Sequence, residues 1–132
     1  MPDRAHSEEM TVKRMSTAVF IAAMIVLSVS AQAKDAKLVT VAGELVDTGC
    51  FLAHEAKGPS NADCGTKCVS AGMPMGVLTS KGELYLVTLN HDNPDSYNKL
   101  KGMVGENVSV TGAVYQRAGL RAIEATSAKS GK

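Results

Sequence analysis

The chain has 132 residues, of which 45% are hydrophobic, so it is long enough for one domain of ordinary size. Lys and Arg together number 14 and Asp and Glu 13, which leaves a formal charge of +1 and no strong field to attract nucleic acid. Trp is absent and there are only 3 Tyr and 2 Phe, so aromatic platforms for stacking bases are scarce. Composition therefore argues against a nucleic-acid-binding protein.

Residues 1–33 have the order of a secretory signal peptide. Basic Lys13 and Arg14 precede an uncharged apolar stretch, 16–29, and Ala31-Gln32-Ala33 follows as a small-residue cleavage site. Cleavage after Ala33 predicts a mature chain of residues 34–132, exported to a bacterial periplasm and free of the membrane. A retained membrane anchor is the alternative, because the uncharged stretch 15–33 approaches the roughly 20 residues of a membrane span.

The mature part alternates short strand patterns with glycine-rich turns. Residues 38–46 predict a first strand, and a polar, irregular insertion with the three cysteines follows it. Within the insertion, Asp63 is expected to cap a two-turn helix over 64–70. Strands are then predicted over 75–79, 83–89, 107–115 and 120–126, with a helix from about 95 to 105 and a frayed tail from 127.

The resulting order, three strands, a helix and two strands, predicts an all-β fold, a five-stranded OB-like barrel with its core at about 38–126. Gly43 and Gly112 lie inside strand patterns and are expected to mark bends of the barrel. The cysteine-containing loop and helix form an insertion between the first two strands. The alternative is an open five-stranded sheet with one packed helix.

The insertion carries a Cys-x3-His pair, Cys50 and His54, and a Cys-x3-Cys pair, Cys64 and Cys68. Residues four apart lie on one face of a helix with Cβ atoms about 5–6 Å apart. Tetrahedral zinc needs sulfurs about 3.8 Å apart, whereas a disulfide needs the Cβ atoms themselves that close. The spacing favours a shared ion, and a set of three cysteines and one histidine suits zinc and accepts copper(I).

Three further side chains are candidates for additional metal ligands. Met73 and Met75 flank Pro74 directly after the predicted helix, and thioether sulfur favours copper(I). His91 follows the third predicted strand and is interpreted mainly as a turn residue. The acidic residues Glu44, Asp47 and Glu55 lie near the cluster and are interpreted as solvating charges.

Two alternatives to a metal site stay open. In an oxidising compartment Cys50 could form a disulfide with Cys64 or Cys68, leaving one thiol free and the barrel as a module that binds a ligand or another envelope protein. Thiol redox chemistry is the other alternative and would need a cysteine of lowered pKa. The signatures of common hydrolases, nucleotide-binding proteins and covalent c-type haem are absent from the sequence, so an enzyme is not expected.

Several of these motifs together resemble a group of small exported bacterial proteins that combine an OB-like barrel with a Cys/His-rich first loop. The resemblance extends over most of 38–126 and rests on these residues: Gly43-Glu44-Leu45-Val46-Asp47, Cys50, His54, Cys64, Cys68, Gly72, Met73-Pro74-Met75-Gly76 and Val108-Ser109-Val110-Thr111-Gly112. It implies an exported barrel domain and leaves its role undetermined. Periplasmic copper chaperones are similar in size and barrel class, but the Trp of their Met/His/Trp set is missing here.

Overall fold

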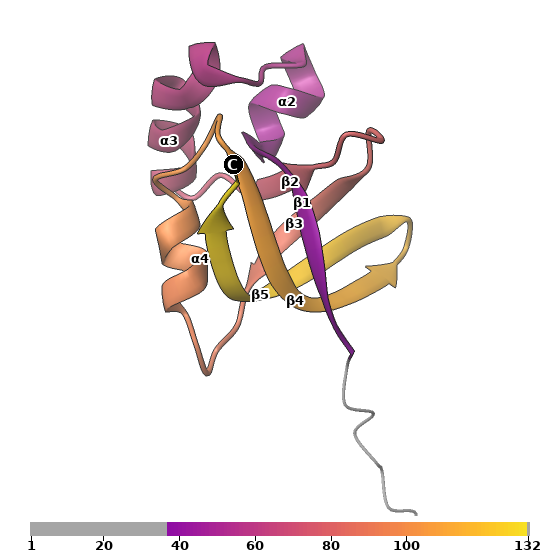
Figure 1. Ribbon diagram of the computed structural model, residues 1–132. Coiled ribbons are helices and arrows are strands. Elements are labelled where there is room, and N and C mark those ends of the chain that lie inside the picture. Colours follow the sequence, from indigo (N-terminus) through magenta and orange to yellow (C-terminus); the bar gives the residue numbers. More distant parts are fainter. Residues whose placement is uncertain (1–36, 132) are drawn as a thin grey trace, which may run out of the picture. The chain divides into compact units, whose positions relative to one another are not determined.

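The structure is a computed structural model that describes residues 37–131, and the five strands in this part form a closed barrel (Figure 1). The strands are β1 (Leu38–Asp47), β2 (Met75–Leu78), β3 (Leu84–Leu89), β4 (Asn107–Arg117) and β5 (Leu120–Ser130). They are arranged in the order β1-β2-β3-β5-β4, and β4 pairs with β1 to close the barrel. Strands β3 and β5 are parallel, and the other neighbours are antiparallel. The predicted all-β, OB-like barrel is therefore confirmed.

Two glycines allow strands to approach where the barrel bends. A Cβ on Gly43 would lie 2.2 Å from the carbonyl oxygen of Leu78, and one on Gly112 would lie 1.9 Å from that of Glu124. The pairing of β4 with β5 shifts register between Thr111 and Gly112, as expected of a β-bulge. Both glycine positions therefore exclude any side chain.

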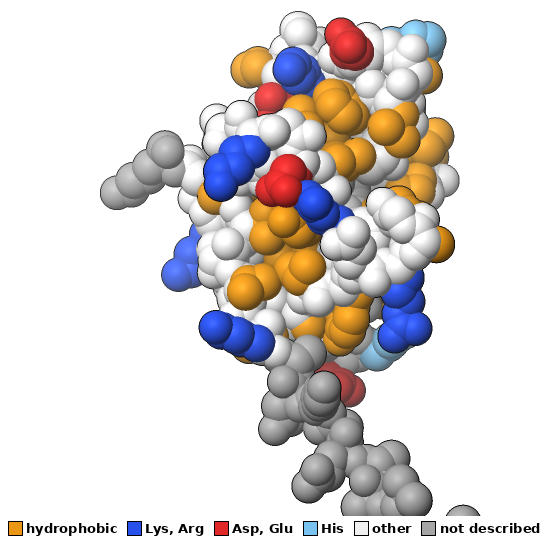
Figure 2. All heavy atoms as spheres, turned by 90° about the vertical axis from the view of Figure 1, so that its right-hand side faces the viewer, with side chains coloured by type: hydrophobic (Ala, Val, Ile, Leu, Met, Phe, Trp, Pro, Cys, Tyr) orange, Lys and Arg blue, Asp and Glu red, His pale blue; other side chains and the backbone are white. Residues whose placement is uncertain are grey.

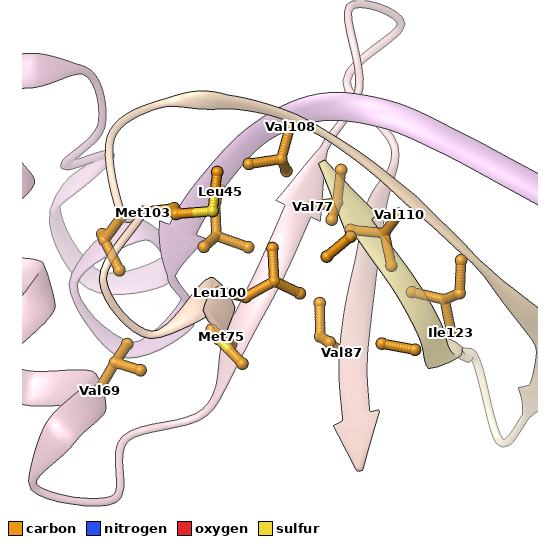
Figure 3. Packing of buried hydrophobic residues seen from close by; sticks show 13 residues of the cluster. Leu45, Val69, Met75, Val77, Val87, Leu100, Met103, Val108, Val110 and Ile123 are labelled. Carbon is orange, nitrogen blue, oxygen red and sulfur yellow. The ribbon is translucent and has the colours of Figure 1, made fainter. Parts of the chain in front are cut away.

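The core fills the barrel with aliphatic and methionine side chains, as the scarcity of aromatic residues requires. Figure 3 shows strand residues such as Val77, Val110 and Ile123 pointing toward Leu100, which α4 (Asp95–Leu100) contributes to the interior. Val69 belongs to the same cluster although it lies in the cysteine insertion. One helix of the insertion is thereby anchored to the barrel core.

The insertion between β1 and β2 contains three helical elements. These are α2 (Thr48–His54), the 3-10 turn η1 (Pro59–Asn61) and α3 (Ala62–Ser70). Helices α2 and α3 lie at one end of the barrel, at the top of Figure 1, whereas the β3–α4 connection lies at the bottom. The chain therefore concentrates its cysteines at a single end of the barrel.

Local structure differs from the sequence prediction in four places. Helix α4 ends at Leu100, whereas the sequence predicts a helix that continues to about 105. The sequence predicts an irregular segment around Cys50, but α2 forms there because Asp47 caps it. Helix α3 begins at Ala62, without the predicted side-chain cap from Asp63. The tail is not frayed, since β5 continues to Ser130 and pairs with the first residues of β4.

One face of the described part of the chain carries mixed charge. On the face shown in Figure 2, acidic and basic side chains are interspersed among apolar patches. Within 37–131, no helix has the length and hydropathy needed to cross a membrane. The expected signal peptide, residues 1–33, lies outside the described residues.

Candidate metal centre

The site begins where β1 ends. Asp47 is completely buried, and its Oδ1 accepts hydrogen bonds from the backbone N–H groups of Gly49 (2.8 Å) and Cys50 (3.3 Å). These bonds satisfy donors that the first turn of a helix leaves free, so α2 starts immediately after the strand. The Asp47 carboxylate therefore fixes the position of Cys50.

In helix α3, two pairs of residues spaced four apart lie on neighbouring faces. Gly65 and Val69 are buried against the barrel, and a Cβ on Gly65 would lie only 2.5 Å from Cγ1 of Val104. Cys64 and Cys68 each precede one of these buried residues, so they lie together along the adjacent face. The absence of a side chain at Gly65 brings α3, and with it both thiols, close to the barrel.

The segment after α3 is hydrogen-bonded to both helices that carry the cysteines, α2 and α3. The backbone N–H of Met73 donates to the carbonyl oxygen of Cys68 (3.0 Å). Pro74 then accepts from both the backbone N–H (3.0 Å) and the hydroxyl (2.8 Å) of Thr48, which is buried at the start of α2. This short segment therefore joins the end of α3 to the beginning of α2 by direct hydrogen bonds.

The three cysteine sulfurs meet between the two helices. Their Sγ atoms all lie within 4.8 Å of one another, and no disulfide joins them. Cys64 is exposed, whereas Cys50 and Cys68 are half-buried. A tetrahedral zinc ion holds thiolates about 3.8 Å apart, so the trio needs only a small contraction to share one ion. The three cysteines could therefore hold a metal ion.

The neighbouring Asp47 and burial raise the pKa of two of the thiols. A side-chain hydrogen bond with Asp47, together with burial and the charge of Asp47, raises the pKa of Cys50 from 9.0 to about 11. Burial, followed by the charge of Cys64 and the neighbouring Asp47, raises the pKa of Cys68. These shifts are opposite to the lowered pKa that activates catalytic thiols. A bound ion would have to displace the thiol protons, so metal binding and proton release are coupled at this site.

The structure brings together three of the four predicted ligands. Among residues 37–131, the cysteines form the only group of three or more Cys, His, Asp or Glu side chains whose ligand atoms come this close. His54 does not join it. It is exposed at the last position of α2, one helical turn or about 6 Å along the axis beyond Cys50. The exposed imidazole of His54 therefore lies outside the cysteine group in this structure.

The structure places the three additional candidate ligands in different environments. His91 is exposed in the connection between β3 and α4, at the opposite end of the barrel in Figure 1, and does not belong to the cysteine group. Met75 is completely buried in the core cluster, where it packs. Met73 is 40% exposed, and its Sδ lies 2.7 Å from the place that a Cβ of Gly49 would take. Of the three, only Met73 borders the site.

Asp47 is the functional residue that the sequence interpretation missed. The sequence predicts a solvating charge on the rim, but the structure buries Asp47 completely, and its carboxyl group raises the pKa of Cys50 and Cys68. The available signal is its position directly before Thr48-Gly49-Cys50, because Asp is a preferred helix N-cap. Glu44 and Glu55 lie elsewhere: Glu44 accepts a hydrogen bond from the backbone of Gly58, and Glu55 is exposed after α2.

Comparison with known protein families and with curated proteins found no match for this chain. The resemblance to small exported barrel proteins therefore stays a prediction. Evidence for function comes from the geometry and chemistry of the cysteine group.

Proposed function

We propose that this protein binds one transition-metal ion through the thiolates of Cys50, Cys64 and Cys68. The proximity of the three sulfurs, all within 4.8 Å, is the observation that supports this function. Thiolate sulfur is a preferred ligand of both zinc and copper(I), and three such groups from two helices leave space for one ion between them. The ion we propose is zinc or copper, in a structural or carrier role.

The proposal includes export. The basic, apolar and small-residue order of 1–33 supports secretion to the periplasm. An oxidising compartment would convert an isolated pair of thiols into a disulfide, and a third thiol would then have no partner. A bound ion gives all three cysteines a common function and protects them from oxidation.

Thiol alkylation with and without metal tests this function. The reduced full-length chain is loaded with zinc or with copper(I), treated with iodoacetamide, and the modified cysteines are counted by mass spectrometry. We expect protection of all three cysteines, lost after addition of a chelator, because the ion occupies the thiolate electron pairs. Equal modification with and without either metal would reject the proposed function. A His54→Ala variant serves as a matched control in α2 and should show the same protection.

A disulfide is the second candidate, and the same short distances favour it. Cys50 lies near both Cys64 and Cys68, so a modest approach of two sulfurs would bring a pair to the roughly 2.05 Å of a bond. In the chain as isolated from its own compartment, one disulfide would leave a single alkylatable cysteine until a reductant is added. A metal site would instead release all three cysteines with a chelator alone.

A further inference from the structure

One buried carboxylate oxygen, at the start of the helix that carries Cys50, has no hydrogen-bond partner. Asp47 has no exposed surface, and while its Oδ1 caps α2, its Oδ2 receives no N–H or O–H hydrogen bond. The carboxyl group caps the helix that carries Cys50, and the Cβ of Asp47 lies 3.6 Å from the place of a Cβ on Gly65, which is between Cys64 and Cys68 in α3. A buried carboxylate oxygen without a strong donor is costly, and an ion is one of the partners that would remove the cost.

We propose that Asp47 Oδ2 is the fourth ligand of the metal site, so that three cysteines and one aspartate bind zinc in preference to copper(I). This inference rests on the proposed function, since it completes the same site. It replaces the expected imidazole of His54 with an oxygen from the end of β1. The fold itself would then supply four ligands, which is the coordination number of structural zinc sites.

The chemistry of the four groups favours zinc over copper(I). Zinc accepts thiolate sulfur at about 2.3 Å and carboxylate oxygen at about 2.0–2.2 Å in one tetrahedral site. Copper(I) is a soft ion that selects thiolate and thioether sulfur, so a carboxylate oxygen adds little to its binding affinity. Three thiolates and one carboxylate carry the same total charge as the four thiolates of an all-cysteine zinc site.

The arrangement of the cysteines indicates how the site would close. The Asp47 carboxylate affects the pKa of Cys50 and Cys68 but does not belong to the group of ligand atoms that lie within 4.8 Å of one another, so it would have to move toward the ion. In this proposal the ion lies between the three sulfurs and Asp47, which caps the helix of Cys50. Cys64 is the exposed member, in the first turn of α3, and is the side chain free to move inward onto the ion.

A water molecule is the competing partner for the buried oxygen. The side-chain nitrogen of Asn61 is also buried without a hydrogen bond, and it lies 3.2 Å from the place of a Gly65 Cβ, which is itself 3.6 Å from Cβ of Asp47. A water that bridges Asn61 and Asp47 would satisfy both groups without any metal. The two explanations differ in whether Asp47 affects the choice of metal.

The test compares zinc and copper(I) affinities of full-length, reduced variants by competition with chelators of known affinity. Asp47→Asn and Asp47→Ser both keep a side-chain helix cap, so at least one should preserve the fold, and thermal unfolding of the metal-free forms checks this. Met73→Leu is the matched control, since it removes a sulfur that borders the site without changing Asp47 or the cysteines. X-ray absorption of the zinc-loaded chain should give three sulfur neighbours and one oxygen.

We expect both Asp47 variants to lose at least about tenfold in zinc affinity and to keep their copper(I) affinity, while Met73→Leu keeps both. Unchanged zinc affinity in a folded Asp47 variant overturns this inference but leaves the proposed cysteine site intact. An equal loss of zinc and copper(I) affinity has the same consequence, because it indicates that Asp47 is purely structural or binds a bridging water. An equal loss of zinc affinity in Met73→Leu also overturns it. A wild-type chain that binds neither metal rejects the proposed function, and this inference with it.

Discussion

Replacing Cys64 by serine should remove metal-dependent stability while leaving the metal-free protein almost unchanged. Cys64 is exposed in the first turn of α3, and exposed substitutions change unfolding free energy by no more than about 0.5 kcal/mol. The described barrel has 95 residues (37–131), for which the unfolding entropy is about 0.2 kcal/mol per kelvin. The melting temperature of the metal-free variant should therefore stay within about 2.5 °C of the wild type.

Zinc should stabilise the wild type much more than Cys64→Ser. At a free zinc concentration about 100 times the dissociation constant, linkage stabilises the native state by about 2.7 kcal/mol, a rise of roughly 13 °C. If loss of one thiolate weakens binding about 100-fold, the same zinc concentration stabilises Cys64→Ser by only about 0.4 kcal/mol, or roughly 2 °C.

Calorimetric unfolding in zinc-buffered solution, without and with zinc, measures both shifts. A wild-type melting temperature that does not respond to zinc would refute the linkage between zinc and folding. An equally large response in Cys64→Ser would refute the assignment of Cys64 as a ligand. Met73→Leu, which leaves all three thiols in place, should respond like the wild type.

Three further predictions concern the cap of α2, the Cys50 thiol and the close approach of β4 to β5. Asp47→Ala should lower the metal-free unfolding free energy by about 1 kcal/mol, since it removes the cap on Gly49 and Cys50; denaturant titration measures this, and an unchanged midpoint would contradict the cap. Because the pKa of Cys50 is raised, its protonated thiol stabilises the fold fully below pH 9.0, and this contribution is lost as the pH rises through about 11. The unfolding free energy of the wild type should therefore fall more than that of Cys50→Ser over this interval. Parallel pH profiles of unfolding free energy would argue against the shift. Gly112→Ala should destabilise by about 1–3 kcal/mol or prevent folding, because its Cβ would lie 1.9 Å from the carbonyl oxygen of Glu124; a melting temperature equal to the wild type would show that the strands can separate there.

The barrel could be predicted because its strands carry local signals. Residues 107–115 alternate valine with polar or small residues, and β4 indeed turns Val108 and Val110 into the core. Residues 127–130 lack such a pattern, so their pairing with β4 had no local indication. Their strand is imposed by a neighbour distant in sequence, which propensity does not describe.

The site was predictable only in part, for a similar reason. The spacing of Cys64 and Cys68 fixes them on one face of a helix, and Cys50 is expected near them because all three share the insertion. The exposure of His54 and the burial of Asp47 depend on where α2 begins and how it meets the barrel. Those features arise from packing between elements, which the spacing of residues along the sequence does not describe.

Native mass spectrometry of the chain purified without chelator is the sharpest test of whether the three thiolates hold a metal ion. We expect a mass increment of one zinc or copper ion that disappears on acidification and is lost or strongly reduced in Cys64→Ser. A metal-free mass two hydrogen atoms below that of the fully reduced chain would contradict the metal site, because it would show that two of the three cysteines form a disulfide instead.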